Sequence, residues 1–167
     1  MNLLKKYDKK KITLFLIIII FAFILFLFIF SKNSVANIYY RTYTKENGWT
    51  KWCKNSQICG TSNNISAIQI KLKSNLKGDV AFNTYYKDSN EKYLSSNKIS
   101  GNKKDDIIGI RIGLTKDLGK KYNVVYRTKN KDKEWGEWVK SDTALFYSEG
   151  LSEFFPIKKI QIKIEKK

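Results

Sequence analysis

The chain is 167 residues long and carries 32 Lys and Arg against 15 Asp and Glu, a formal charge of +17, with no histidine. This length indicates one small domain. Without histidine, the chain has no Ser-His-Asp or Cys-His nucleophile pair, no histidine-ligated zinc and no imidazole acid–base step. Only three basic residues are arginines. Lysines carry the rest of the charge, and they suit a general electrostatic surface better than bidentate recognition.

The N-terminal region predicts a transmembrane helix over residues 12–30. This run, ITLFLIIIIFAFILFLFIF, has no charged residue. Its 19 residues match a hydrocarbon core of about 30 Å, where a helix satisfies its own backbone groups. Five lysines and one aspartate precede it, so the positive-inside rule places residues 1–11 in the cytoplasm. We expect a signal-anchor at the cell membrane, a linker over 31–36 and an extracytoplasmic domain over 37–167.

A cleaved signal peptide is the alternative, because Ser34-Val35-Ala36 has the small residues that a signal peptidase needs. The apolar run is longer than the usual core of a signal peptide, about 7–15 residues, and this favours a retained anchor. Residues 31–167 carry 27 basic and 14 acidic residues, a charge of +13. Anionic wall polymers or lipid head groups are natural long-range partners of such a domain, although solubility alone also explains the charge.

The outer domain contains three repeats. Tyr40-Arg41-Thr42 recurs as Tyr126-Arg127-Thr128, and an alternating apolar run occurs at 68–72, 110–114 and 160–164. Three copies of one pattern indicate a repeat architecture. We place the repeats at about 37–77, 78–121 and 122–167, the last with an insertion over 141–155.

Each alternating run predicts a β-strand with one apolar face. A second strand is expected earlier in each copy, at 37–44, 80–86 and 123–129. No amphipathic helical period follows residue 30, so the domain is predicted to be all-β. A β-trefoil and a threefold β-prism both fit three units of about four short strands, and both limit exposed sheet edges.

The first copy resembles a clostridial hydrophobic Trp-containing (ChW) repeat. The resemblance rests on Tyr40-Arg41-Thr42, Gly48-Trp49, Cys59-Gly60-Thr61 and the alternating run that ends at Leu72. The third copy keeps two tryptophans but has Glu134 in place of the glycine, and the second has Glu91 where the Trp should be. The resemblance implies a secreted or surface-attached module that binds polysaccharide or cell-surface partners.

The four tryptophans are the main candidate residues. Flat aromatic rings stack on sugars, but they also fill cores. Positions three apart in a regular strand point to opposite faces. We therefore expect Trp49 and Trp135 to be structural core residues and Trp52 and Trp138 to be exposed. The candidate ligand-binding residues are Trp52, Trp138, Tyr43, Arg41 and Arg127.

The two cysteines are six residues apart in the first copy, and a hairpin centred on Ser56 places them opposite each other. Antiparallel neighbours reach the spacing of a disulfide, and an exported domain permits oxidation, so Cys53–Cys59 is a candidate disulfide. Two buried thiols are the alternative. Two cysteines fall short of the four ligands of a structural zinc site, so no metal is expected.

No catalytic arrangement is apparent. The paired carboxylates, such as Asp105-Asp106, fall in polar loops and not in a cleft that would raise one pKa. We expect no enzyme activity, no cofactor and no nucleic-acid partner. The expected function is a non-catalytic cell-surface binding or adhesion module for polysaccharide, an anionic wall polymer or a protein partner. The alternative is a structural or accessory subunit of an envelope assembly without a glycan ligand.

Overall fold

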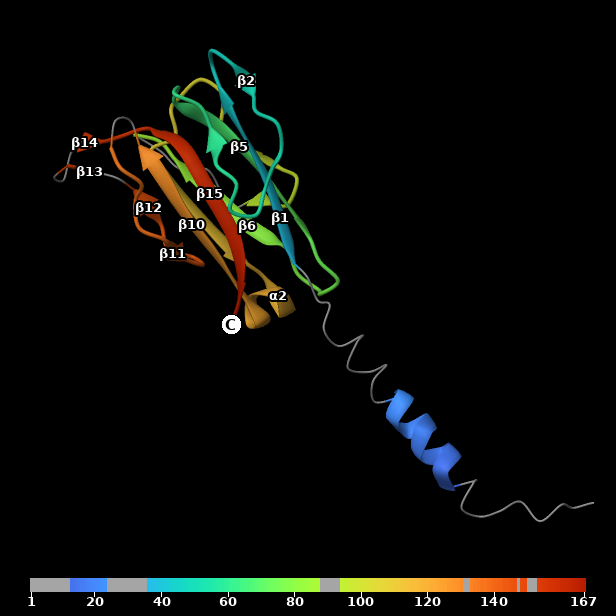
Figure 1. Cartoon of the computed structure of the whole chain (residues 1–167). Coiled ribbons are helices and arrows are strands. Elements are labelled where there is room, and N and C mark those ends of the chain that lie inside the picture. Colours follow the sequence, from blue (N-terminus) through green and yellow to red (C-terminus); the bar gives the residue numbers. More distant parts are fainter. Residues whose placement is uncertain (1–12, 24–35, 88–93, 131–132, 147, 150–152) are drawn as a thin grey trace, which may run out of the picture. The chain divides into compact units, whose positions relative to one another are not determined.

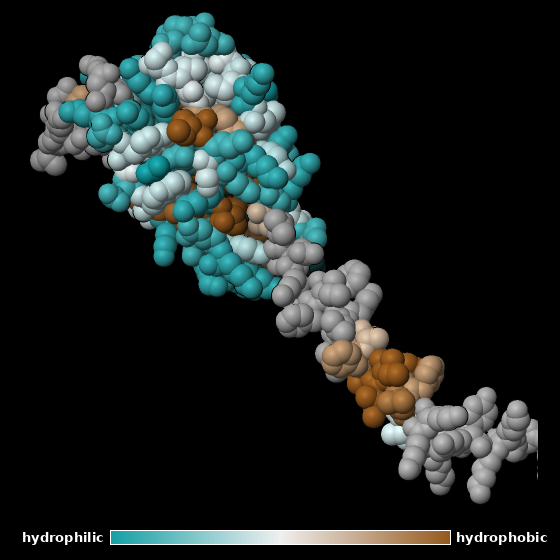
Figure 2. Space-filling view, viewed as in Figure 1, coloured by the Kyte–Doolittle hydropathy of each residue, from teal (hydrophilic) through white to brown (hydrophobic). Residues whose placement is uncertain are grey.

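The structure is a computed structural model that describes residues 13–23, 36–87, 94–130, 133–146, 148–149 and 153–167 (Figure 1). Contacts divide the chain into two compact units, Met1–Val35 and Ala36–Lys167. The second unit begins one residue before the predicted β domain. It carries 26 basic and 14 acidic residues, and hydrophilic residues cover much of the face seen in Figure 2.

The N-terminal unit corrects the membrane prediction. Residues 13–23 are helical, and at 1.5 Å per residue these 11 residues span about 16 Å. Within the described ranges, no helix combines the length and the apolar content needed to cross a membrane. This finding contradicts the predicted transmembrane helix, the single-pass signal-anchor and the cell-membrane location. Residues 1–12 and 24–35, with the expected cytoplasmic tail and the ends of the expected span, lie outside the described residues.

Three long antiparallel strand pairs build the second unit, one from each predicted repeat. The first strand of the first pair buries every second residue, as the pattern predicted. Other long strands also bury some consecutive residues, such as Val124, Val125 and Tyr126. The pairs are β1 (Asn37–Thr44) with β5 (Ile65–Lys73), β6 (Val80–Tyr85) with β9 (Gly109–Leu114), and β10 (Tyr122–Asn130) with β15 (Ile157–Lys166). We call the sheets around these pairs sheet 1, sheet 2 and sheet 3, in chain order.

Each repeat gives one short strand to the sheet of another repeat. From the second repeat β8 pairs with β5, from the third β12 pairs with β9, and from the first β4 pairs with β15. The other short strands, β2, β3, β7 and β11, pair within their own repeat. The bounds are β2 (Gly48–Trp49), β3 (Cys53–Lys54), β4 (Cys59–Gly60), β7 (Leu94–Ser95), β8 (Ile99–Ser100), β11 (Val139–Lys140) and β12 (Leu145–Phe146). The exchange closes the three sheets into a ring.

The arrangement of the three sheets tests the predicted all-β fold class of this unit. The all-β prediction for this unit is compatible with the structure, but a β-trefoil is not shown, because the long pairs stay in separate sheets. The combined prediction of a three-repeat β domain preceded by a transmembrane helix is wrong in its membrane part.

Two smaller elements were not predicted. A helix of six residues, α2 (Lys116–Lys121), lies at the end of the predicted second repeat. Its one buried side chain, Leu118, packs with Ala36 and Tyr122. A helix of six residues with one buried side chain shows no helical period in the sequence. In the predicted insertion, β13 (Ser148–Glu149) pairs with β14 (Glu153–Phe154).

The same turn leads into the exchanged strand in all three repeats. One residue in each turn has a left-handed φ of about 60°, and its N–H donates a 2.8 Å hydrogen bond to a carbonyl of the neighbouring sheet. The three bonds run from Ser56 to Ile162, from Asn97 to Ile70 and from Asp142 to Ile112. Polar residues of this kind tolerate a left-handed conformation in turns.

Two buried tyrosines fasten the exchanged strands. The Tyr40 hydroxyl donates to the Gln57 carbonyl and accepts a 3.0 Å hydrogen bond from the Ile162 N–H. Tyr126 makes the same two bonds, donating to Thr143 and accepting from Ile112 at 3.1 Å. Burial raises the pKa of Tyr40 to about 12, against a smaller lowering by the Ile162 N–H.

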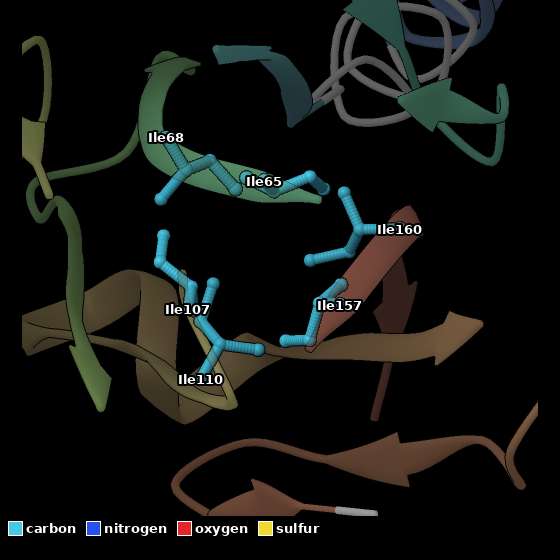
Figure 3. Close-up of a pocket in the computed structure, with 6 residues that line it drawn as sticks. All are labelled: Ile65, Ile68, Ile107, Ile110, Ile157 and Ile160. Carbon is cyan, nitrogen blue, oxygen red and sulfur yellow. The ribbon is translucent and has the colours of Figure 1, made fainter. Parts of the chain in front are cut away.

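Six isoleucines meet where the three sheets converge (Figure 3). Ile107 N–H donates to the Ile65 carbonyl and Ile157 N–H to the Ile107 carbonyl, both at 2.8 Å. The small cavity between them, about 10 Å³, has only apolar side chains around it, and such cavities stay dry. It is a packing feature of the core. The six are Ile65, Ile68, Ile107, Ile110, Ile157 and Ile160.

Candidate binding site

The outer face of sheet 1 gathers most of the predicted site residues. On β1, the side chains of Tyr39, Arg41 and Tyr43 alternate with buried neighbours and remain half-buried. Arg41 lies opposite Gln69 and Tyr39 lies opposite Lys71 in the register with β5. The face therefore presents a row of aromatic and basic side chains on a rigid strand pair.

Arg41 lies between two tryptophans. Its guanidinium carbon is 4.6 Å from the ring centroid of Trp49 and 4.8 Å from that of Trp52. Lys71 Nζ lies 3.9 Å from the Trp52 centroid. We call Trp49, Arg41, Trp52 and Lys71 the first ladder. Each cation–π contact contributes about 0.5–2 kcal/mol, depending on exposure.

A hydrogen-bond relay orients the arginine. Arg41 Nε donates to Gln69 Oε1 at 2.9 Å, and Gln69 Nε2 donates to the Asn97 carbonyl at 2.7 Å. Asn97 is the left-handed turn residue that the second repeat contributes next to sheet 1. The ladder is thereby tied to the exchanged turn, which fixes the plane of the guanidinium.

Sheet 3 carries an equivalent arrangement, which we call the second ladder: Trp135, Arg127, Trp138 and Lys163. The Arg127 guanidinium is 4.8 Å from the Trp135 centroid and 4.6 Å from that of Trp138, and Lys163 is 4.4 Å from Trp138. Arg127 Nε donates to Gln161 Oε1 at 2.8 Å, and Gln161 Nε2 donates to the Ser56 carbonyl at 2.7 Å.

The expected division of each Trp pair into one buried and one exposed ring is not found. Trp49, Trp52, Trp135 and Trp138 are all half-buried, and none is part of the buried core. The alternation rule fails because residues 50–52 lie outside the strands. Both rings of a pair can therefore turn to the same face and enclose one guanidinium.

The first ladder has aromatic and basic neighbours at both ends. Lys54, Lys71 and Lys73 each lie 5.7 Å from the Tyr39 centroid. Lys103 lies 5.1 Å from the Tyr43 centroid, and Tyr43 meets Trp49 edge to face at 5.4 Å. Among the described residues, no carboxylate forms an ion pair with these lysines or with Arg41.

The second ladder has different neighbours. Val125 and Lys129 stand at the positions that Tyr39 and Tyr43 occupy in sheet 1. Lys163 Nζ forms a 2.7 Å ion pair with Glu165. Glu165 occupies the position of Lys73, so this ladder has a carboxylate where the first has an amine.

Sheet 2 has no ladder among its described residues. Asn83 takes the position of the arginine and Arg111 that of the glutamine. Arg111 Nε donates directly to the Asp142 carbonyl at 2.6 Å, so the turn contact survives without the relay. Glu91, at the expected Trp position of this repeat, lies outside the described residues.

The predicted disulfide between Cys53 and Cys59 is present. It joins β3, which pairs with β1, to β4, which pairs with β15. Cys53 directly follows Trp52, so the bridge also anchors the loop that holds the first ladder. In the described part of the chain, no group of three His, Cys, Asp or Glu residues is placed to hold a metal ion.

No protein-family model matches the chain, and no curated protein or solved structure matches it. The resemblance to ChW repeats therefore stays a prediction.

Proposed function

We propose that this protein is a non-catalytic binding module for polysaccharide and that the first ladder with its neighbours is the binding site. The supporting observation is the row of half-buried aromatic rings on the outer face of sheet 1, together with cations that form no ion pair within the described part of the chain. Aromatic side chains with a polar group at one end are favoured at binding surfaces because they provide large contact areas.

The rigidity of this face supports the same proposal. Arg41 is held by Gln69 and by two rings, and the loop of Trp52 is closed by the disulfide. A surface whose side chains are already ordered loses less conformational entropy when it binds a ligand. The predicted contacts Arg41, Tyr43 and Trp52 belong to this face, whereas Trp138 and Arg127 belong to the second ladder.

The test is binding of the full chain to a panel of neutral and acidic polysaccharides, with Trp52→Ala compared with Trp138→Ala. Both changes remove one ring from an Arg–Trp stack, so they perturb folding in the same way. We expect Trp52→Ala to lower affinity at least tenfold, about 1.4 kcal/mol. Trp138→Ala should leave affinity within about threefold of the wild type, a loss below about 0.7 kcal/mol.

Equal losses in the two variants would show that the site is not on sheet 1. Absence of binding to every polysaccharide, with both variants folded, would reject the proposal and favour an accessory subunit that makes only protein contacts.

A further inference from the structure

We propose that the ligand is an acidic polysaccharide and that Arg41 binds its carboxylate or phosphate groups through the two terminal guanidinium nitrogens. This inference rests on the proposed function, since it assigns a chemical class to the ligand of the same site. Carboxylates and phosphates share the feature that matters, two oxygens spaced to accept a pair of parallel N–H bonds.

The bonding of Arg41 leaves these nitrogens available. Its Nε is used by Gln69, and its guanidinium carbon lies under 5 Å from two indole centroids. Within the described residues, no group forms a hydrogen bond or ion pair with its terminal nitrogens. A planar guanidinium with a fixed orientation presents a fork that binds an oxyanion in bidentate fashion.

The contacts of the tryptophans favour an acidic over a neutral ligand. Trp52 is already in contact with Arg41 and Lys71, and Trp49 with Arg41 and, at 5.8 Å, Lys103. A neutral sugar that stacked on a ring face already in contact with a cation would displace that cation and lose the cation–π contact. An anion bound at the terminal nitrogens leaves the stack in place.

The neighbouring lysines add to the same preference. Lys71, Lys73 and Lys103 lie around the ladder and have no ion-pair partner among the described residues. Like charges held close together repel one another, and a bound polyanion removes this repulsion. A polymer with repeated acidic groups also places several charges along one row of cations.

Arg127 provides the internal control. It has two equivalent indole contacts, with Trp135 and Trp138, and donates to the equivalent glutamine, Gln161. However, Glu165 neutralises Lys163 beside it and would repel an incoming anion. The two arginines therefore share a structural role, and they differ in that a carboxylate pairs with the lysine beside Arg127, whereas no described residue pairs with the lysine beside Arg41.

The experiment measures affinity of the full chain for three probes: polygalacturonate, a glycerol-phosphate polymer and an uncharged glucan. Wild type is compared with Arg41→Lys and Arg127→Lys, which keep the charge but lose the fork. We expect the wild type to prefer at least one acidic probe over the glucan. Arg41→Lys should weaken that binding at least tenfold, and Arg127→Lys less than threefold. The stronger acidic probe identifies carboxylate or phosphate as the group bound.

A second measurement removes the dependence on variants. In the wild type, the guanidinium Nε–H nuclear magnetic resonance signal of Arg41 should shift with a saturable dependence on the acidic probe, and that of Arg127 should not. Equal losses in the two lysine variants, or equal shifts of the two signals, would overturn the assignment to Arg41. Glucan binding as tight as acidic binding would overturn the inference but leave the proposed function standing. No binding to any probe would reject both.

Discussion

The two ladders share one internal structure and differ in what surrounds it. Each holds an arginine between two tryptophans, and each arginine reaches a neighbouring turn through a glutamine. Around the first ladder are two tyrosines and lysines that pair with no carboxylate of the described residues, whereas the second has Val125, Lys129 and the Lys163–Glu165 ion pair.

The comparison distinguishes residues that stabilise the fold from residues that are available to bind a ligand. Features that occur in both ladders fasten an exchanged turn to its sheet, and they explain why these residue types recur at the same spacing. Features that occur only in sheet 1 are not needed for that task. The flanking tyrosines, and Lys73 where sheet 3 has Glu165, are therefore the part of the molecule that a ligand explains best.

The largest effect is expected from alkaline pH, through Tyr40. Its pKa is raised from 10.0 to about 12 in the folded protein, so the unfolded chain ionises first. The contribution of Tyr40 to stability is fully present below pH about 10 and is lost as pH rises from about 10 to about 12, a change of roughly 2–3 kcal/mol. Urea unfolding at pH 9 to 12 measures this slope. Tyr40→Phe should reduce it, and an unchanged slope in that variant would contradict the assignment to Tyr40.

Loss of the disulfide should lower the free energy of unfolding, because the loop that holds the first ladder would then lack its covalent link, as the loop of the second ladder does. Closing a loop as short as the one from Cys53 to Cys59 contributes about 2–3 kcal/mol in the chain-entropy description. A reducing agent should lower the unfolding free energy of the wild type by about that amount and leave Cys53→Ala/Cys59→Ala unaffected. Equal sensitivity of both proteins would show that the bridge does not stabilise the fold.

The two tyrosine hydroxyls should be equivalent. Tyr40→Phe and Tyr126→Phe each leave a buried backbone N–H and a carbonyl without their partner. We expect each change to cost about 1–3 kcal/mol at neutral pH, with values for the two variants within about 1 kcal/mol of each other. Phe82 buries a ring at the corresponding position of β6 without a hydroxyl, and Phe82→Leu serves as a packing control. A negligible effect in either Tyr variant would contradict the proposed fastening role.

The smallest effect is expected from exchanging the charges that distinguish the ladders. Lys73→Glu copies the second ladder's carboxylate into sheet 1, and Glu165→Lys does the reverse. Lys73→Glu should weaken acidic polysaccharide binding about fivefold, which corresponds to roughly 1 kcal/mol. Glu165→Lys should strengthen it by a smaller factor, with both effects fading at high salt. If Glu165→Lys strengthened binding by as large a factor as Lys73→Glu weakened it, affinity would follow the net charge of the protein and not the position of the charge.

Strand periodicity and repeats were readable from the sequence because they follow from regular alternation. The prediction for 37–44 coincides with β1, and the two other early strands differ from β6 and β10 by one residue at their ends. The disulfide was also predictable, since it depends on local spacing.

The strand exchange was not predictable because β4, β8 and β12 are two residues long and carry no periodic signal. The Arg–Trp stacks were missed because Trp52 and Trp138 lie outside strands, where the alternation of a strand does not predict which way a side chain points. The repeated Tyr-Arg-Thr and Trp-x-x-Trp motifs were the available signal, since they place one arginine and two tryptophans in each of two copies. The membrane helix was inferred from the length of an apolar run, whereas no helix among the described residues is long and apolar enough to cross a membrane.

The most direct test of the central claim is a titration of the ¹⁵N-labelled full chain with an acidic oligosaccharide, followed at the four indole N–H signals. If sheet 1 is the binding face, the signals of Trp49 and Trp52 shift and saturate together, while those of Trp135 and Trp138 stay in place. Shifts confined to Trp135 and Trp138, or equal shifts of all four, would contradict the account.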